Sequence, residues 1–297
     1  MRLTYHDGLS LHYRSYGNGE PVLLIHGLGG SGADWALQVS ALQRRFRLIV
    51  PDLPGCGLSS PPRGAYSISG FACALWSLLK ELEVPRVNVV GFSMGGAVAL
   101  EMALQRPTLV SRLALINSLA TYRDQWRKWL YARTCIALIR LIGMRKAARI
   151  FAARLFPEPW QQAFRDRAAT VVAAVPASSY LGMARALEQW EATDRLDRLS
   201  TRTLVIAAEY DHTPLAEKRA LAARLRASMV VVQGSRHGTP FDASEATNSS
   251  LLALLTDQLL TPYERLARDT PARAQALVRR VGGRVLERLD NVADSSS

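Results

Sequence analysis

Apolar and polar residues alternate along the first 117 residues in a pattern of short buried strands separated by amphipathic helices. Short continuous apolar runs are typical of strands buried on both faces of a sheet, whereas apolar residues spaced three and four apart are typical of helices. After an N-terminal hairpin at residues 2–16, strands are predicted at 21–25, 47–50, 87–90 and 112–116, and helices at 35–42 (with Asp34 as the cap), 67–82 and 94–105. The pattern predicts an α/β fold with a mostly parallel, doubly wound sheet.

This alternation stops between residues 118 and 199, where only helical periodicity is found, and it resumes afterwards. Strands are predicted at 203–208 and 229–232, and helices at 216–225 and 244–260. The chain is therefore predicted to contain an α/β core, formed by residues 1–117 and 200–260, and an all-helical insertion at 118–199. Residues 261–297 are predicted to form an Arg-rich C-terminal tail, in which the pattern at 271–290 favours a helix.

The overall composition is that of a water-soluble globular protein. Apolar residues make up 48% of the 297 positions and charged residues 21%. We find no uninterrupted apolar run of membrane-spanning length and no signal-peptide pattern in residues 1–17. The three cysteines (Cys56, Cys73 and Cys135) are widely spaced and form no Cys-x-x-Cys motif. Free thiols in a reducing, cytoplasmic compartment are therefore expected, and no metal site.

The net charge of +12 does not by itself indicate a polyanionic partner. Arginine is abundant together with alanine and leucine, and no compact basic block with interleaved aromatic residues is present, so nucleic-acid binding is not expected. In the insertion, Arg133 and Arg140 share one face of an apolar helix at 129–142. These arginines either face water, meet an acidic group of the substrate or support weak contact of the insertion or the tail with a membrane surface.

One pentapeptide carries the strongest chemical signal. Gly91-Phe92-Ser93-Met94-Gly95 follows a predicted buried strand and opens a predicted helix. A tight strand-to-helix turn needs glycines on both sides of its apex, and it exposes the apical serine beside a helix N-terminus, where negative charge is favoured. Ser93 is thus a candidate nucleophile, although Gly-x-Ser-x-Gly alone also occurs in ordinary turns.

A candidate acid and a candidate base follow at the ends of two later strands. Asp211 lies in the loop after the strand at 203–208, and it is preferred over Glu209 because Glu209 lies at the strand end itself. His237 follows the strand at 229–232. His6 and His12 belong to the N-terminal hairpin and are expected at the surface, and the ring of His212 is expected to face solvent. The carboxyl ends of parallel strands meet at one edge of the sheet, so Asp211 and His237 are predicted to lie near Ser93.

The order Ser93, Asp211, His237, together with the loop at His26-Gly27 and the segment Asp52-x-Pro54-Gly55, resembles the serine-nucleophile branch of the α/β-hydrolase superfamily over residues 1–260. The resemblance implies that Ser93 is the nucleophile, His237 the general base and then acid, and Asp211 the group that orients the imidazole. It also implies an oxyanion hole formed by the backbone N–H groups of Leu28 and Met94, with His26 and Gly27 supporting that loop, and a cap formed by residues 118–199. The serine argues against the aspartate-nucleophile dehalogenases and epoxide hydrolases of the same fold.

The sequence thus predicts a cofactor-independent serine hydrolase that cleaves a carboxylic ester or a related small acyl compound through an acyl-enzyme. Hydrolysis of a lactone or of a carbon–carbon bond on the same triad is an alternative, as is acyl transfer to an alcohol. A catalytically silent scaffold used for binding is a further alternative, because a fold does not guarantee an activity. The glycine-rich stretch at 27–32 lacks the Gly-Lys-Ser/Thr ending of a phosphate-binding loop, so no nucleotide is expected.

Overall fold

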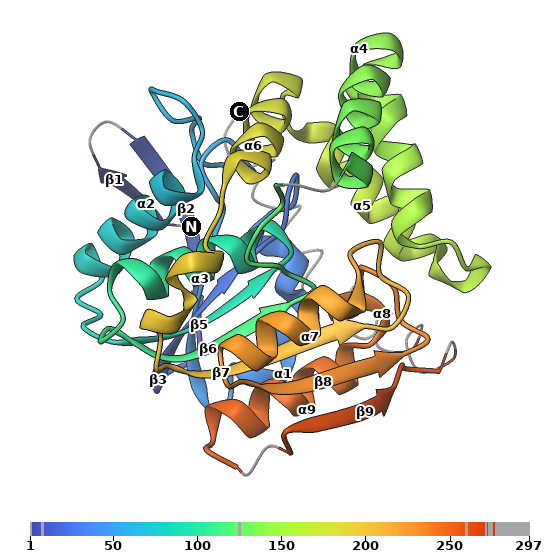
Figure 1. Ribbon diagram of the computed structural model, residues 1–297. Helices are drawn as coiled ribbons and strands as arrows, with labels where there is room; N and C mark the ends of the chain where they lie inside the picture. Colours follow the sequence, from blue (N-terminus) through green and yellow to red (C-terminus); the bar gives the residue numbers. More distant parts are fainter. Residues whose placement is uncertain are drawn as a thin grey trace.

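A single mixed sheet forms the centre of the molecule (Figure 1). The computed structural model describes residues 2–6, 9–123, 126–258 and 261–270, together with residues 272 and 276. In these residues the sheet has nine strands, in the order β1-β2-β4-β3-β5-β6-β7-β8-β9. The strands are β1 (Arg2–His6), β2 (Leu9–Tyr16), β3 (Glu20–Ile25), β4 (Phe46–Pro51), β5 (Val87–Phe92), β6 (Val110–Ile116), β7 (Arg202–Ala208), β8 (Ser228–Gln233) and β9 (Tyr263–Ala267). Only the pairs β1–β2 and β2–β4 are antiparallel, and the other pairs are parallel, as the alternation predicted.

Helices cover both faces of the sheet, because successive residues of each strand point to opposite sides. In β3, Leu23 and Ile25 belong to the core cluster under α2 (Ile68–Glu81) and α3 (Met94–Gln105). Val22 and Leu24 belong to the cluster under α1 (Ala36–Leu42) and α9 (Ser244–Leu255). The all-apolar strands of the sequence are therefore the strands that are buried on both faces.

The helix predicted at residues 35–42 starts earlier than expected. A 3-10 turn, η1 (Gly32–Trp35), precedes α1, and the capping residue is Ser31. The prediction that Asp34 is the cap is wrong. Asp34 lies within the first turn, three residues after Ser31, and its carboxylate accepts a hydrogen bond from the Ser31 amide at 3.0 Å. An acidic residue in this position satisfies a free N–H at the helix start as a capping residue would, and for that reason the two roles are hard to separate in a sequence.

The segment between β6 and β7 is helical, as predicted. It contains α4 (Trp126–Leu155), η2 (Pro159–Gln161), α5 (Gln162–Ala174), α6 (Ala177–Gln189) and η3 (Thr193–Arg198). In Figure 1, α4 and α5 (green) and α6 lie together outside the sheet, and α4 contacts both of the other helices. The predicted apolar helix at 129–142 ends at a kink, because Gly143 has a left-handed φ of 77° inside α4.

The C-terminal region differs from the prediction in two respects. The last predicted helix ends at Leu255 rather than at residue 260, and Tyr263–Ala267, assigned to the tail by the sequence pattern, forms strand β9 parallel to β8. An exposed edge strand contains polar residues, so its pattern resembles that of a tail. Most of the helix predicted at 271–290 lies outside the described residues. Within the part of the chain that is described, no helix is both long and apolar enough to cross a membrane.

Candidate active site

The order of the strands determines where a site can form. Strand β3 lies between β4 and β5. The chain therefore passes from β3 to β4 on one side of β3 and then returns to form β5 on the other side. At such a switch point the loops at the carboxyl ends of the strands diverge and leave a crevice. The loops that follow β3, β5, β6, β7 and β8 all belong to this edge of the sheet.

Ser93 forms the apex of the turn between β5 and α3. Its backbone has φ 54° and ψ −119°, a conformation that a residue with a side chain adopts only under constraint. The constraint comes from close backbone packing: a Cβ added to Gly91 would lie 2.2 Å from the Gly95 carbonyl oxygen, and one added to Gly95 would lie 2.2 Å from that of Ile25. Both glycines are therefore required for the turn that exposes the hydroxyl of Ser93.

The structure brings Ser93, His237 and Asp211 together in one chain of hydrogen bonds. The Ser93 hydroxyl lies 2.8 Å from Nε2 of His237, and Nδ1 of the same ring donates to Oδ1 of Asp211 at 2.8 Å. The Asp211 side chain has no exposed surface, and that of His237 is 14% exposed. The ring of Phe92, next to the serine, packs against the imidazole with 5.2 Å between centroids. The imidazole is thus held in one orientation between the hydroxyl and the carboxylate.

The charges around the imidazole favour an ionised acid and a neutral base. Burial alone would raise the pKa of Asp211, but the charge of His237, hydrogen bonds from His212 and His237 and the charge of Lys218 together lower that pKa far below its usual range. Burial lowers the pKa of His237, and His212 and Lys218 lower it further, against the attraction of Asp211. His237 is therefore able to accept a proton at neutral pH. Glu209 is engaged elsewhere, since its carboxylate accepts hydrogen bonds from Arg265 and from the Gly234 amide.

Hydrogen bonds of His26 hold the loop after β3 in place. This histidine is fully buried; its Nδ1 donates to the Gly27 carbonyl oxygen at 2.8 Å and its Nε2 accepts from the Leu53 amide at 2.9 Å. Both ring nitrogens are therefore used for support of the loop, and neither faces the serine. Gly27 lies close to the nucleophile, because an added Cβ would be 3.3 Å from the Cβ of Ser93. Leu28 follows Gly27 in the chain, and Met94 begins α3 directly after Ser93.

The prediction that His12 lies at the surface is wrong. His12 is 1% exposed, and its Nδ1 is 2.8 Å from Oδ2 of Asp52. Asp52 also accepts from the amides of Gly32 (2.7 Å) and Leu58 (3.0 Å). The pair ties the second strand of the N-terminal hairpin to the loops beside the site. The burial of His12 is hard to predict from the sequence, because it depends on the tertiary pairing of β2 with β4.

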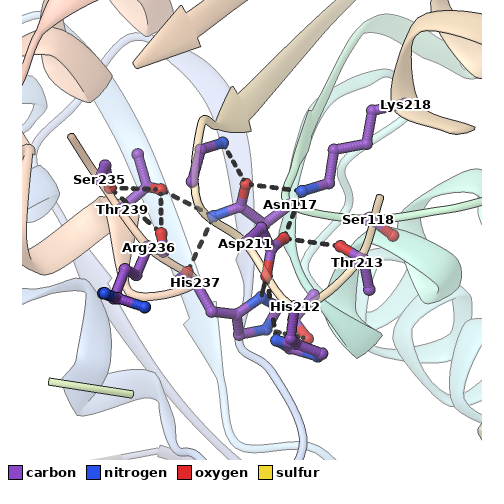
Figure 2. A network of polar contacts seen from close by, with 12 residues as sticks. Asn117, Ser118, Asp211, His212, Thr213, Lys218, Ser235, Arg236, His237 and Thr239 are labelled. Atoms are coloured by element: carbon purple, nitrogen blue, oxygen red, sulfur yellow. Dashed lines mark hydrogen bonds and ion pairs between the residues drawn. The ribbon is translucent and has the colours of Figure 1, made fainter. Parts of the chain in front are cut away.

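Two further polar residues at this edge, Lys218 and Asn117, were not among the predicted site residues, and a third, His212, was expected only to face solvent (Figure 2). Lys218 on α7 (Leu215–Arg224) contacts Asp211, and Asn117, after β6, donates to the His237 carbonyl oxygen at 2.8 Å. The His212 ring is partly exposed, as expected, but it lies 4.3 Å from the His237 ring between centroids, and its Nδ1 is 3.0 Å from Oδ1 of Asp211. The burial of Lys218 could have been predicted from the sequence, because this lysine lies three, four and seven residues before the apolar Leu221, Ala222 and Leu225, which are all buried.

Asp211, His212 and His237 form the only group in the described part of the chain whose donor atoms are close enough together for a metal ion, within 4.8 Å of one another. These donors already hydrogen-bond to each other, and the ammonium of Lys218 adds positive charge at the same carboxylate. The same three side chains thus belong to the hydrogen-bonded chain that includes Ser93. A separate groove of about 720 Å³ between α1, α9 and the residues after β9 contains none of the three side chains.

Helices of the insertion pack directly against the loops of the site. A Cβ added to Gly29 would lie 2.8 Å from the Tyr180 ring on α6, and one added to Gly238, next to His237, would lie 2.5 Å from the Phe156 ring. Gln161 of η2 donates to the buried carboxyl group of Asp242 at 3.1 Å, and burial raises the pKa of that group to about 7. The insertion is thus in contact with the loop after β3 on one side and with the loop of His237 on the other.

Comparison with known proteins places these features in a family. An uncharacterized protein of Mycobacterium bovis is 41% identical over 112 residues, which are 38% of this chain and 33% of that protein, so the match spans only about a third of the relative. A Pseudomonas syringae protein named "Putative carbamate hydrolase RutD" is 30% identical over 255 residues, covering 83% of this chain and 98% of that one. The crystal structure of a thermophilic esterase from Thermogutta terrifontis is similar with a TM-score of 0.76 and 26% identity, over 86% of this chain and 96% of the esterase.

The model of the alpha/beta hydrolase fold matches residues 20–244, which contain the turn at Ser93, the helical insertion and the loops that carry Asp211 and His237. The strand order, the strand-to-helix turn and the position of the helical segment between β6 and β7 agree with this match. The chain therefore belongs to the alpha/beta hydrolase fold family.

Proposed function

We propose that this protein is a serine hydrolase that cleaves a carboxylic ester or a related acyl compound through an acyl-enzyme. The observation that supports the proposal best is the continuous chain of hydrogen bonds from Ser93 through His237 to the buried carboxylate of Asp211. A serine hydroxyl is a weak nucleophile until a neighbouring base takes its proton, and this geometry supplies the base.

The first half of the reaction forms the acyl-enzyme. Nε2 of His237 takes the Ser93 proton while Oγ attacks the carbonyl carbon, and the new imidazolium is stabilised by Asp211. The negative charge that develops on the carbonyl oxygen is accepted by the backbone N–H groups of Leu28 and Met94, each of which is expected to contribute about 3 kcal/mol in the transition state. His237 then gives its proton to the leaving alkoxide, and the alcohol departs.

The second half releases the acid. A water molecule gives a proton to Nε2 of His237 and attacks the acyl carbon, the same two N–H groups accept the charge again, and Oγ of Ser93 leaves with the proton from His237. The products are a carboxylic acid, an alcohol and the free enzyme. No step needs a cofactor, since the three side chains and two amides carry all proton transfers and charges.

We also propose that residues 118–199 act as a cap that selects the acyl group. The contacts of Tyr180 with the loop of Gly29 and of Phe156 with the loop of His237 support this role, because they place the insertion against two loops beside Ser93. The ring of Tyr180 stacks on that of Phe151, 5.9 Å away, which favours an apolar acyl group beneath the cap.

Replacement of the nucleophile tests the proposal. Ser93→Ala is expected to lower kcat/KM for ester substrates by about 10³-fold or more, because the covalent route is lost. Ser77→Ala, which changes a half-buried serine on α2, serves as the matched control and should retain wild-type turnover. A fluorophosphonate probe should label the wild-type protein at Ser93 and leave the Ser93→Ala variant unlabelled. Full turnover by Ser93→Ala would refute the mechanism, and failure of the folded wild-type protein to react with the probe would favour the binding scaffold.

A second candidate reaction is hydrolysis of a carbamate on the same triad, favoured by the nearly full-length match to the Pseudomonas syringae protein. A panel of esters, thioesters, lactones and carbamates of graded acyl length separates these classes. Probe labelling without turnover across the panel would favour carbon–carbon bond hydrolysis, and a product that changes on addition of an alcohol would indicate acyl transfer.

A further inference from the structure

Lys218 is an internal cation that the hydrolytic mechanism does not use. It lies on the face of α7 that carries Leu221 and Ala222, and its side chain has no exposed surface. Removing an ammonium from water costs several kcal/mol unless a buried partner compensates, so a lysine in this position requires a specific counter-charge. Its Nζ contacts Oδ2 of Asp211 and lies 3.4 Å from Oδ1 of Asn117 (Figure 2).

The two oxygens of Asp211 have different partners. Oδ1 faces Nδ1 of His237 at 2.8 Å and Nδ1 of His212 at 3.0 Å. Oδ2 faces the ammonium of Lys218 and accepts from the Thr213 hydroxyl at 2.7 Å. A carboxylate held in this way cannot rotate without breaking a charge-assisted hydrogen bond in a site that excludes water. The lysine therefore determines which oxygen the catalytic histidine meets.

We propose that Lys218 is a positioning residue of the hydrolytic site: its ammonium holds Oδ1 of Asp211 towards His237 and offsets part of the carboxylate's charge, so that His237 remains a neutral base in mildly acidic solution. The proposal rests on the proposed function of the triad. Lys218 contacts neither the substrate nor the reacting atoms, and it acts only through Asp211.

The sign of the effect follows from the charges that face His237. Asp211 attracts the imidazolium, whereas His212 and Lys218 oppose it. Two further titratable groups lie near the pair. Burial lowers the pKa of Lys218, and the charges of Asp211 and of Glu217 on the same helix oppose that shift. Burial raises the pKa of Tyr122, and the charge of Asp211 raises it further. Loss of the lysine charge removes one repulsive interaction and leaves the charge of Asp211 without an offset. The pKa of His237 should then rise, and a larger fraction of the enzyme should be inactive at low pH.

The test is the pH profile of kcat/KM for an activated ester such as 4-nitrophenyl acetate. We expect Lys218→Met to move the midpoint of the acidic limb upward by about one pH unit and to lower kcat by about tenfold, since Asp211 also loses its anchor. Lys218→Arg keeps the charge and should keep the midpoint close to that of the wild type. The matched control is Lys80→Met, which removes an exposed lysine on α2 and should change neither quantity. A folded Lys218→Met variant with the wild-type midpoint would overturn the proposal, because a purely structural lysine would affect stability without moving the limb.

A second measurement uses the unaltered protein and decides the matter if Lys218→Met does not fold. The chain contains only four lysines, so ¹⁵N-lysine labelling gives a side-chain spectrum that the Lys80→Met variant helps to assign. Nζ of Lys218 should have the chemical shift of an ammonium from pH 6 to pH 9, and a neutral amine in this range would overturn the proposal. Turnover by Ser93→Ala would refute the hydrolase mechanism separately, because the lysine spectrum does not depend on activity.

Discussion

Replacement of Asn117 should weaken both the fold and the reaction. Asn117 is fully buried at the end of β6 and joins three neighbouring loops. Its Nδ2 donates to the His237 carbonyl oxygen at 2.8 Å and to the Thr239 hydroxyl at 2.7 Å, and its Oδ1 accepts from the Ala208 amide at 2.7 Å. The same side chain therefore connects the end of β7, which precedes the catalytic acid, with the loop of the catalytic base.

The cost of Asn117→Ala follows from these contacts. The His237 carbonyl and the Ala208 amide both lose this partner, and a buried group without a partner costs about 1–3 kcal/mol. Thr239 keeps the Arg236 carbonyl oxygen at 3.0 Å as an acceptor and adds little. Asn117 also has a left-handed φ of 48°, which alanine adopts at a cost of about 1 kcal/mol more than asparagine. The expected loss is about 3–6 kcal/mol of unfolding free energy, together with a roughly tenfold or larger fall in kcat/KM as His237 loses its tether.

Urea unfolding at pH 7.5, followed by circular dichroism, measures the stability, and the ester assay measures the rate. Asn117→Gly should be less destabilised than Asn117→Ala by about 1 kcal/mol, because glycine adopts the left-handed conformation freely. The control is Asn248→Ala, since Oδ1 of Asn248 has no hydrogen-bond partner among the described residues and its Nδ2 is a long 3.4 Å from the Leu37 carbonyl oxygen. A loss of less than about 1 kcal/mol in Asn117→Ala, equal to that of the control, would refute the reasoning.

Two further predictions concern pH. In the wild-type enzyme, kcat/KM should rise with pH to a plateau with a midpoint below pH 6.5, because burial, His212 and Lys218 lower the pKa of His237. A midpoint above pH 7 in the ester assay would contradict this prediction. Asp242 has a pKa raised by burial to about 7, against an ordinary value of 3.8, so the folded state keeps a proton that the unfolded chain has released. Its contribution to stability is therefore present at low pH and lost as the pH rises towards 7, by up to about 4 kcal/mol. Asp242→Asn should flatten the dependence of Tm on pH between 4 and 8, and an unchanged slope would exclude this role.

The local pattern of the chain determined the fold class and selected Ser93, Asp211 and His237 as candidate site residues. Strands that are buried on both faces, such as β3 and β5, consist largely of consecutive apolar residues. Parallel strands bring their carboxyl ends to one edge of the sheet. For this reason Ser93, Asp211 and His237 could be assigned to one place from their positions after three separate strands, and the structure does bring them within hydrogen-bonding distance. The choice of Asp211 over Glu209 followed in the same way.

Only the tertiary structure decided which other polar groups complete the site. Lys218 lies on a helix whose periodicity shows a buried face, but the counter-charge that makes its burial tolerable comes from a loop seven residues earlier, and Asn117 comes from another strand. His12 is buried only because β2 pairs with β4, and β9 is a strand only because β8 offers it a partner. Propensity and periodicity act over neighbouring residues, whereas the burial of a charge and the pairing of an edge strand depend on contacts between distant segments. The contacts of the segment between β6 and β7 with the loops of Gly29 and His237 were decided at the same level.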